Sequence, residues 1–144
     1  MIACLLALPL AVVLLQVDDL GRDFTTNVAE TSWSAADPAL HPIATERSTD
    51  ETVVAIKEAA SRLPRWTIVA EERDGGLAVL RFVRTSGLFR FKDDVTVLVE
   101  DERGRRVISA TSRSRVGKGD LGQNPRNLRA LMGAVRQRLG LEAI

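Results

Sequence analysis

Cysteine and histidine are almost absent from this 144-residue chain, which contains one of each. The single cysteine, Cys4, has no intramolecular disulfide partner, and one thiol with one histidine cannot supply the usual zinc ligands. Serine and cysteine nucleophiles normally act with a nearby histidine base, but the only histidine, His41, precedes a proline in a turn-like segment. These shortages argue against a zinc site and nucleophilic catalysis, and we predict no catalytic residue, metal or cofactor.

Aromatic residues are scarce as well, at 4% of the chain, and none lies between residues 103 and 144. This part of the chain is strongly basic: residues 103–138 contain ten bases and one acid, whereas residues 18–58 contain nine acids and three bases. Single-strand nucleic-acid binders usually stack bases on aromatic side chains, so we predict no nucleic-acid partner. The asymmetry indicates either a basic surface for an anionic partner or two segments that face each other.

Charge is also missing from the N-terminal segment, residues 1–17, where Gln16 is the only strongly polar residue. As a helix it would be about 25 Å long, at the short end for crossing a bilayer. No basic residue precedes it and no small-x-small cleavage site follows it, which favours an uncleaved membrane anchor over a cleaved signal or a core helix. The flanking charges do not fix the orientation. Export is the default for such a segment, so we expect the C-terminal domain on the extracytoplasmic side of the membrane.

The rest of the chain divides into two parts. Residues 18–47 are polar and contain two X-Pro turn signals, which predict an extended linker or N-terminal arm. Residues 48–144 carry the pattern of a folded domain. Ser48 to Glu51 forms a capping box before an apolar helical stripe that ends at Pro64. Near the C-terminus, Asn124 and Pro125 predict the start of a second amphipathic helix, which ends at Gly140.

Four strand-like runs separate the two predicted helices. The runs cover residues 66–72, 77–84, 95–100 and 106–112, with glycine-containing turns between them. Short connections favour an antiparallel meander, and two amphipathic helices can cover one of its faces. We therefore predict an α+β fold: a two-layer sandwich of a four-stranded antiparallel meander with an N-terminal and a C-terminal helix, preceded by the anchor helix.

A glycine-rich basic segment, residues 112–127, is the main candidate for a binding site. Glycine permits positive φ angles and close backbone approach, and exposed amides at a helix start favour anions. The segment lacks the P-loop spacing, because Asp120 follows Gly117-Lys118-Gly119. It is either a rigid turn or a site for a simpler anion. The residues expected to hold such a ligand are Arg113, Ser114, Arg115, Lys118, Asp120, Asn124 and Arg126.

Asp93 and Asp94 form the best carboxylate pair in the chain. Adjacent residues in a strand point to opposite faces, so the two are not expected to act jointly on one substrate. The structural interpretation is that one of them pairs with Arg113 or Arg115 and fixes the glycine-rich segment against the sheet. The alternative is an acid/base role or an oxygen-ligand metal site that includes Asp120.

Several short motifs together resemble one protein family, the domain-of-unknown-function family 1499. They are Phe89-Arg-Phe-Lys-Asp-Asp-Val95, Ser114-Arg-Val-Gly117, Asp120-Leu-Gly122 and Asn124, with Thr25-Thr-Asn27 and Trp66 in matching places. The resemblance covers roughly residues 24–140. Family arginines before the first serine and after the asparagine are replaced here by Thr111, Pro125 and Asn127, with Arg113 and Arg126 one residue away, which is typical of a sub-branch. The resemblance implies a bacterial envelope or plastid location and no particular chemistry.

Three functions follow from these patterns. The first is a membrane-anchored, non-catalytic binding or accessory module, whose glycine-rich segment holds an anionic small molecule or an acidic protein surface. The second is a structural or interaction protein with a closed Asp–Arg network. The third is an enzyme that uses Asp93, Asp94 or Asp120. The sequence favours them in that order.

Overall fold

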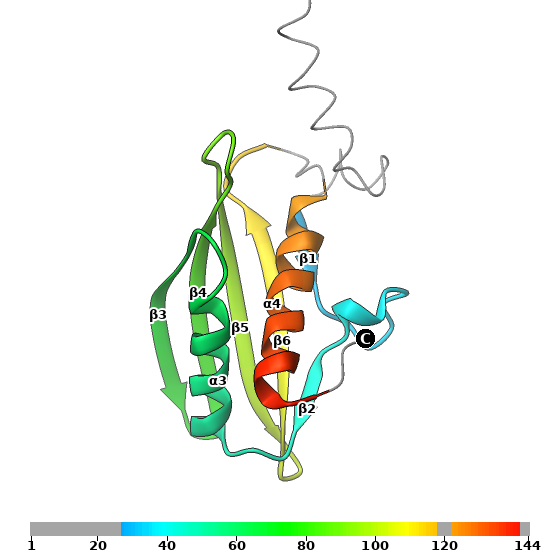
Figure 1. The fold of residues 1–144 in the computed structure, drawn as a ribbon. Helices are drawn as coiled ribbons and strands as arrows, with labels where there is room; N and C mark the ends of the chain where they lie inside the picture. The colour runs from blue at the N-terminus through cyan, green and yellow to red at the C-terminus, as the bar shows by residue number, and fades with distance from the viewer. Residues whose placement is uncertain (1–26, 118–121, 142–144) are drawn as a thin grey trace, which may run out of the picture.

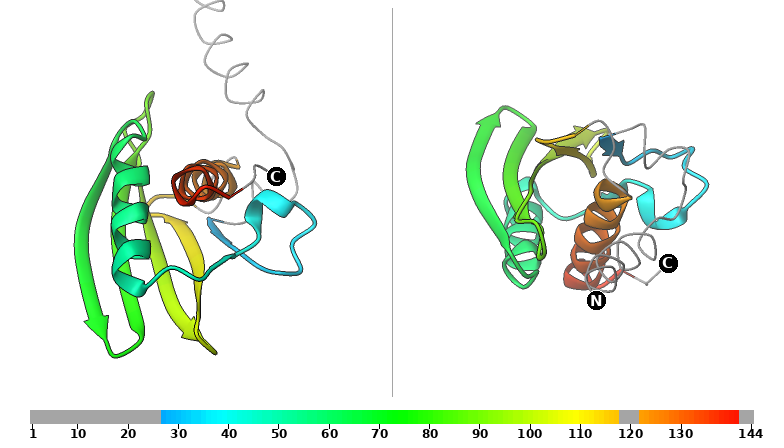
Figure 2. Two further views of the ribbon diagram at one scale, coloured as in Figure 1. Left: turned by 60° about the horizontal axis from the view of Figure 1, so that its bottom comes forward. Right: turned by 90° about the horizontal axis from the view of Figure 1, so that it is seen from above.

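The computed structural model describes residues 27–117 and 122–141. These residues form one antiparallel sheet of six strands with two helices, α3 (Thr49–Ser61) and α4 (Gln123–Leu139), packed on the same face (Figures 1 and 2). The predicted α+β class with two helices over a mostly antiparallel sheet is confirmed. None of the helices in this part of the chain has the length and apolar character needed to cross a bilayer. The predicted anchor, residues 1–17, lies outside the described residues.

The centre of the sheet is the predicted meander. Its strands are β3 (Trp66–Asp74), β4 (Leu77–Thr85), β5 (Lys92–Glu102) and β6 (Arg105–Ser114). The β5–β6 connection contains only Arg103 and Gly104, at φ 55° and 86°. Two positive φ angles match the right-handed twist of the flanking strands, which is why a two-residue hairpin loop closes there.

The prediction of four strands was wrong, because two short strands extend the sheet. β1 (Val28–Glu30) and β2 (Ile43–Thr45) both pair antiparallel with the outer edge of β6, one near each of its ends. Between them lies a short 3-10 helix, η1 (Pro38–Leu40). Each strand has three residues, too few to show period-two alternation. This part of the predicted N-terminal arm is thus hydrogen-bonded to the sheet.

The hydrophobic core lies between the sheet and the two helices. On β5, Val95, Val97 and Val99 are fully buried on the covered face, as their alternation predicts. The apolar stripes of the helices meet them, and burial of such side chains is the main force that holds the layers together. The largest core side chains are Phe82, Ile56, Leu80, Ile108, Leu128, Leu131 and Met132.

The ends of the helices agree with the prediction except at one point. The capping box of Ser48 and Glu51 is present, and Gly140 terminates α4 at φ 73°. However, α4 begins at Gln123, and its N-cap residue is Gly122 rather than Asn124. Asn124 therefore lies inside the first turn, where its side chain is buried and points toward the sheet. This difference of two residues brings Asn124 into the site described next.

Candidate functional site

A cluster of buried polar side chains lies where β5, β6 and the first turn of α4 meet. We call it the polar cluster. Each of its residues is at most 9% exposed. Polar groups buried this deeply cost free energy unless they are hydrogen-bonded. The members are Asp93, Ser112, Ser114, Asn124 and Asn127.

Asp93 is the centre of the polar cluster. Its Oδ1 accepts a 2.8 Å hydrogen bond from Ser114 Oγ, and its Oδ2 accepts one of 2.8 Å from Asn127 Nδ2. The same Nδ2 also donates to Ser112 Oγ at 3.2 Å. Gln123 Nε2 donates to Asn127 Oδ1 at 2.7 Å, so the amide group of Asn127 is oriented from both ends. The carboxylate is therefore held by the protein itself.

Asn124 connects the polar cluster to the N-terminal strand. Its Oδ1 accepts a hydrogen bond of 2.6 Å from Ser112 Oγ, and its Nδ2 donates to the Asn27 carbonyl at 2.7 Å and to Ser114 Oγ at 3.1 Å. Ser114 N–H also donates to the Asn27 carbonyl at 2.9 Å. The start of β1, the end of β6 and the first turn of α4 are thus fastened at one point.

Arg84 on β4 supplies a positive charge close to Asp93. Its side chain is 15% exposed, and its Nη1 lies 3.7 Å from Asp93 Oδ2, too far for a hydrogen bond. That buried nitrogen has no hydrogen-bond partner among the residues that the structure describes. Burial lowers the pKa of Arg84, and the nearby Asp93 charge opposes this effect. The guanidinium therefore compensates the buried carboxylate without a direct hydrogen bond.

Asp94 lies on the other face of the sheet and pairs with Arg115. Arg115 Nε and Nη2 donate to its two carboxylate oxygens at 2.9 and 2.6 Å, a bidentate pair. These hydrogen bonds lower the pKa of Asp94. Asp93 and Asp94 thus point to opposite faces, and the predicted pairing of an aspartate with Arg115 is present. The geometry does not bring the two carboxylates to one substrate.

The predicted ligand-binding residues do not form one group in the structure. Arg113 and Arg115 are exposed, Ser114 and Asn124 belong to the polar cluster, and Arg126 is half-buried in the first turn of α4. Lys118 and Asp120 lie outside the described residues. Before this gap, Gly117 takes φ 88°, and its carbonyl accepts a 3.2 Å hydrogen bond from Asn27 Nδ2.

Three site residues were missed by the sequence analysis: Arg84, Ser112 and Asn127. Two of them carried a usable signal. Ser112 and Ser114 are two residues apart in a strand and share a face, while Asn124 and Asn127 are three apart in a helix and are neighbours. Matching pairs of small polar residues on adjoining elements indicate a buried network. Nothing in the local sequence of Arg84 indicates its position.

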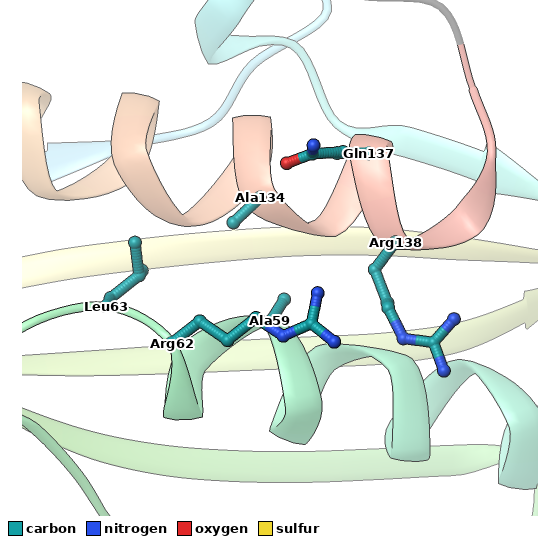
Figure 3. Close-up of a pocket in the computed structure, with 6 residues that line it drawn as sticks. All are labelled: Ala59, Arg62, Leu63, Ala134, Gln137 and Arg138. Carbon is teal, nitrogen blue, oxygen red and sulfur yellow. The ribbon is translucent and has the colours of Figure 1, made fainter.

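The structure also contains a separate cavity between the two helices, shown in Figure 3, with a volume of about 410 Å³. Arg62 at the end of α3 and Arg138 on α4 lie beside it, and Arg138 forms an ion pair with Glu58. The remaining lining residues are Ala59, Leu63, Ala134 and Gln137. The small facing side chains of Ala59 and Ala134 leave this gap between the helices. None of the predicted site residues that the structure describes lines it.

Within residues 27–117 and 122–141, no group of three or more histidine, cysteine, aspartate or glutamate side chains is placed to hold a metal ion. His41 lies in the turn after η1, with its Nε2 2.8 Å from the Ala35 carbonyl oxygen. Its surroundings are those of a turn residue.

The sequence matches the family described as "Protein of unknown function (DUF1499)" over residues 19–135, most of the chain. The chain belongs to this family. In this DUF1499 protein, the stretches that carry the resemblance, Phe89–Val95, Ser114–Gly117 and Asn124, come together at one end of the sheet, around the polar cluster.

Comparisons with individual proteins add little to the family assignment. No curated protein matches this DUF1499 chain. Among solved structures, the crystal structure of TTHA0849 from Thermus thermophilus matches with a TM-score of 0.35 and 9% sequence identity, over 78% of this chain and 96% of that chain. A likeness at this level supports no conclusion about function.

Proposed function

We propose that this DUF1499 chain is a non-catalytic accessory domain, tethered to a membrane by residues 1–17 on the extracytoplasmic side, which binds an anionic ligand at one end of its sheet. The tether follows from the apolar N-terminal sequence. Binding is supported by the charges at the end of the sheet where β5 begins and β6 ends. We call this end the basic end.

The observation that carries the proposal is the excess of exposed positive charge at the basic end. Arg90, Lys92, Arg113 and Arg115 are all exposed there. Among the described acids there, Asp94 neutralises Arg115 and Asp93 is buried in the polar cluster, which leaves Arg90, Lys92 and Arg113 as the excess positive charge. Positive side chains concentrated on one exposed surface attract anions.

The polar cluster orders the backbone that carries these cations. Its hydrogen bonds fasten β5, β6, α4 and the start of β1 together at the basic end. A site whose backbone is already ordered loses less entropy when a ligand binds. The lower entropy loss explains why a network of buried polar groups lies next to an exposed charged surface.

Binding of a fluorescein-labelled polyglutamate peptide to the full chain in nonionic detergent tests the proposal. The double variant Lys92→Glu/Arg113→Glu should bind the peptide at least about tenfold more weakly than the wild type, roughly 1.4 kcal/mol. The matched control is Arg103→Glu/Arg105→Glu, which makes the same charge change at the exposed β5–β6 turn at the opposite end. It should bind within about twofold of the wild type.

Two results would contradict anion binding at this end. One is the absence of salt-sensitive binding by the wild type. The other is an equal loss in both double variants, which would show that only the net charge matters.

The second candidate is a purely structural role for the network, and the closure of the polar cluster favours it. In that case Asp93, Asp94 and their partners serve only stability. Substitutions at the basic end would then lower the melting temperature without a separate loss of peptide binding. Comparing the two readouts for Arg115→Ala distinguishes the candidates, since binding predicts a weaker interaction even where the protein stays fully folded.

A further inference from the structure

An exposed apolar patch lies at the tip of the basic end, and it is not explained by binding of a soluble anion. We call it the apolar tip: Leu88, Phe89, Phe91 and Val116. Their exposed fractions are 63%, 54%, 49% and 59%. We propose that the apolar tip inserts into the interfacial region of an anionic lipid surface while the surrounding cations contact the headgroups. This inference rests on the proposed function, because it names the anionic partner of that same end.

The apolar tip is held together by the β4–β5 connection. Ser86 N–H donates to the Phe91 carbonyl at 2.8 Å, and Phe91 N–H donates to Ser86 Oγ at 2.8 Å, which closes the loop at its base. The rings of Phe89 and Phe91 stack with centroids 5.4 Å apart. Two aromatic rings and a leucine are thus presented outward by a short closed loop.

Val116 joins the apolar tip from the segment that follows β6. Arg115 N–H donates to the Lys92 carbonyl at 3.0 Å, so the chain beyond β6 continues beside the start of β5. Continuing the β5–β6 register beyond Asp93 and Ser114 sets Val116 opposite Phe91. The patch therefore spans two adjacent segments, and large exposed apolar patches of this kind mark interaction surfaces.

The charges around the apolar tip favour lipid over an apolar protein surface. Arg90 lies between the two phenylalanines in the sequence. Lys92, at the start of β5, and Arg115, just after β6, flank them. Basic side chains next to exposed aromatic and aliphatic side chains are typical of proteins that bind at the surface of anionic membranes. The aliphatic stems of such cations lie along apolar surface while their charged ends remain in water.

The position at which the described chain begins also supports a lipid surface as the partner. Asn27 is the first described residue, and its Nδ2 donates to the Gly117 carbonyl at 3.2 Å. The start of β1 thus lies at the same end of the sheet as the β4–β5 loop (Figure 1). The chain between residues 17 and 27 can span at most roughly 35 Å. A membrane that holds residues 1–17 is therefore within reach of the apolar tip.

The experiment uses the full chain with Cys4→Ala, which removes the only cysteine. Leu88→Cys places an environment-sensitive NBD label in the apolar tip, and Glu102→Cys places the same label at the exposed opposite end. The protein is reconstituted in vesicles of phosphatidylglycerol and phosphatidylcholine. We expect doxyl-labelled lipids to quench at least half of the emission at position 88 and less than a tenth at position 102, with a blue shift at position 88 only.

A pair of double substitutions tests the role of the two rings. Phe89→Ser/Phe91→Ser should reduce the doxyl quenching at position 88 at least twofold. The matched control is Val54→Ser/Val69→Ser, which removes two exposed apolar side chains elsewhere. It should leave the quenching unchanged. Circular dichroism establishes that both variants are folded.

The other outcomes would contradict either the membrane tether or the insertion of the apolar tip. If the chain does not float with vesicles, the tether of the proposed function fails, and this inference fails with it. Flotation with equal quenching at positions 88 and 102 overturns the insertion alone, and polyglutamate binding, which needs only the cations, would still support the proposed function. A blue shift at position 88 without doxyl quenching would mean that a protein surface covers the tip, which also overturns the insertion.

Discussion

The Nδ2 of Asn127 on α4 donates a hydrogen bond to Asp93 Oδ2 on β5 at a distance of 2.8 Å, and both residues are 2% exposed. This contact joins residues that are 34 positions apart in the chain. It holds the start of α4 against the sheet. The Asp93 carboxylate, which belongs to the family motif, therefore has a structural role. The basic end is built on this contact.

Removal of the central carboxylate should destabilise the protein strongly. Asp93→Ala takes away the acceptor of two buried hydrogen bonds and leaves Arg84 without its compensating charge. We expect the free energy of unfolding to fall by about 3 kcal/mol, measured by urea denaturation. Asp94→Ala is the control, because this half-exposed residue pairs with a surface arginine. A loss in the control as large as that in Asp93→Ala would contradict the structural role given to Asp93.

The capping box predicts a smaller and local effect. Ser48 Oγ accepts the Glu51 N–H at 3.2 Å, and the Glu51 carboxylate accepts the Ser48 N–H at 2.9 Å. Ser48→Ala should lower the free energy of unfolding by about 1 kcal/mol, because a backbone donor at the start of α3 loses its partner. Ser61→Ala, at the other end of the same helix, should cost about half as much or less. Urea midpoints at constant m-value give both numbers.

Arg136 should be the arginine of α4 that contributes most to stability. It is 6% exposed and donates to the His41 carbonyl at 2.8 Å and to the Ala39 carbonyl at 3.3 Å. Burial lowers its pKa, and the charge of Asp37 opposes this effect. Arg136→Met should lower the free energy of unfolding by about 2 kcal/mol, since two partly buried carbonyls lose their donor.

A matched arginine on the same helix provides the comparison for Arg136. Arg138 forms an ion pair with Glu58 in which both side chains are at least 40% exposed. Arg138→Met should change stability by less than about 0.5 kcal/mol, as surface pairs usually do. Amide hydrogen exchange adds a local test: protection at Leu40 and His41, whose N–H groups bond within the same turn, should fall in Arg136→Met only. Equal protection in the two variants would show that Arg136 does not hold this turn.

Acid should weaken the attachment of the N-terminal arm to α4. Hydrogen bonds from Arg129 and from the Ala39 N–H hold the pKa of Asp37 below its ordinary value. A lowered pKa in the folded state stabilises the fold above the unfolded pKa of about 3.9, and this contribution is lost as the pH falls through the folded value. In Asp37→Asn the decrease in urea midpoint between pH 6 and pH 3 should be smaller than in the wild type. Arg129→Met should reduce the same pH dependence, and an unchanged slope in both variants would contradict the assignment.

The two helices and the four long strands could be predicted from the sequence because their signals are local. The capping box, the alternating valines of β5 and the glycine at the end of α4 act through neighbours a few residues apart, so the pattern alone carries the information. The sequence also indicated that one of the two aspartates pairs with Arg113 or Arg115, and the structure selects Asp94 and Arg115.

Only the tertiary structure decided which polar side chains are buried and which face solvent. Asp93 and Asp94 are adjacent and identical in type, yet one is 2% exposed and the other pairs at the surface, because only one face of β5 is covered by α4. The two short strands and the first turn of α4 depend likewise on β6: the strands pair with its edge, and Asn124 bonds to the side chains of Ser112 and Ser114. The sequence by itself determined the two helices, the four long strands and their order. Packing decided the site, because its contacts join segments far apart in the chain, and such contacts leave no period in the local sequence.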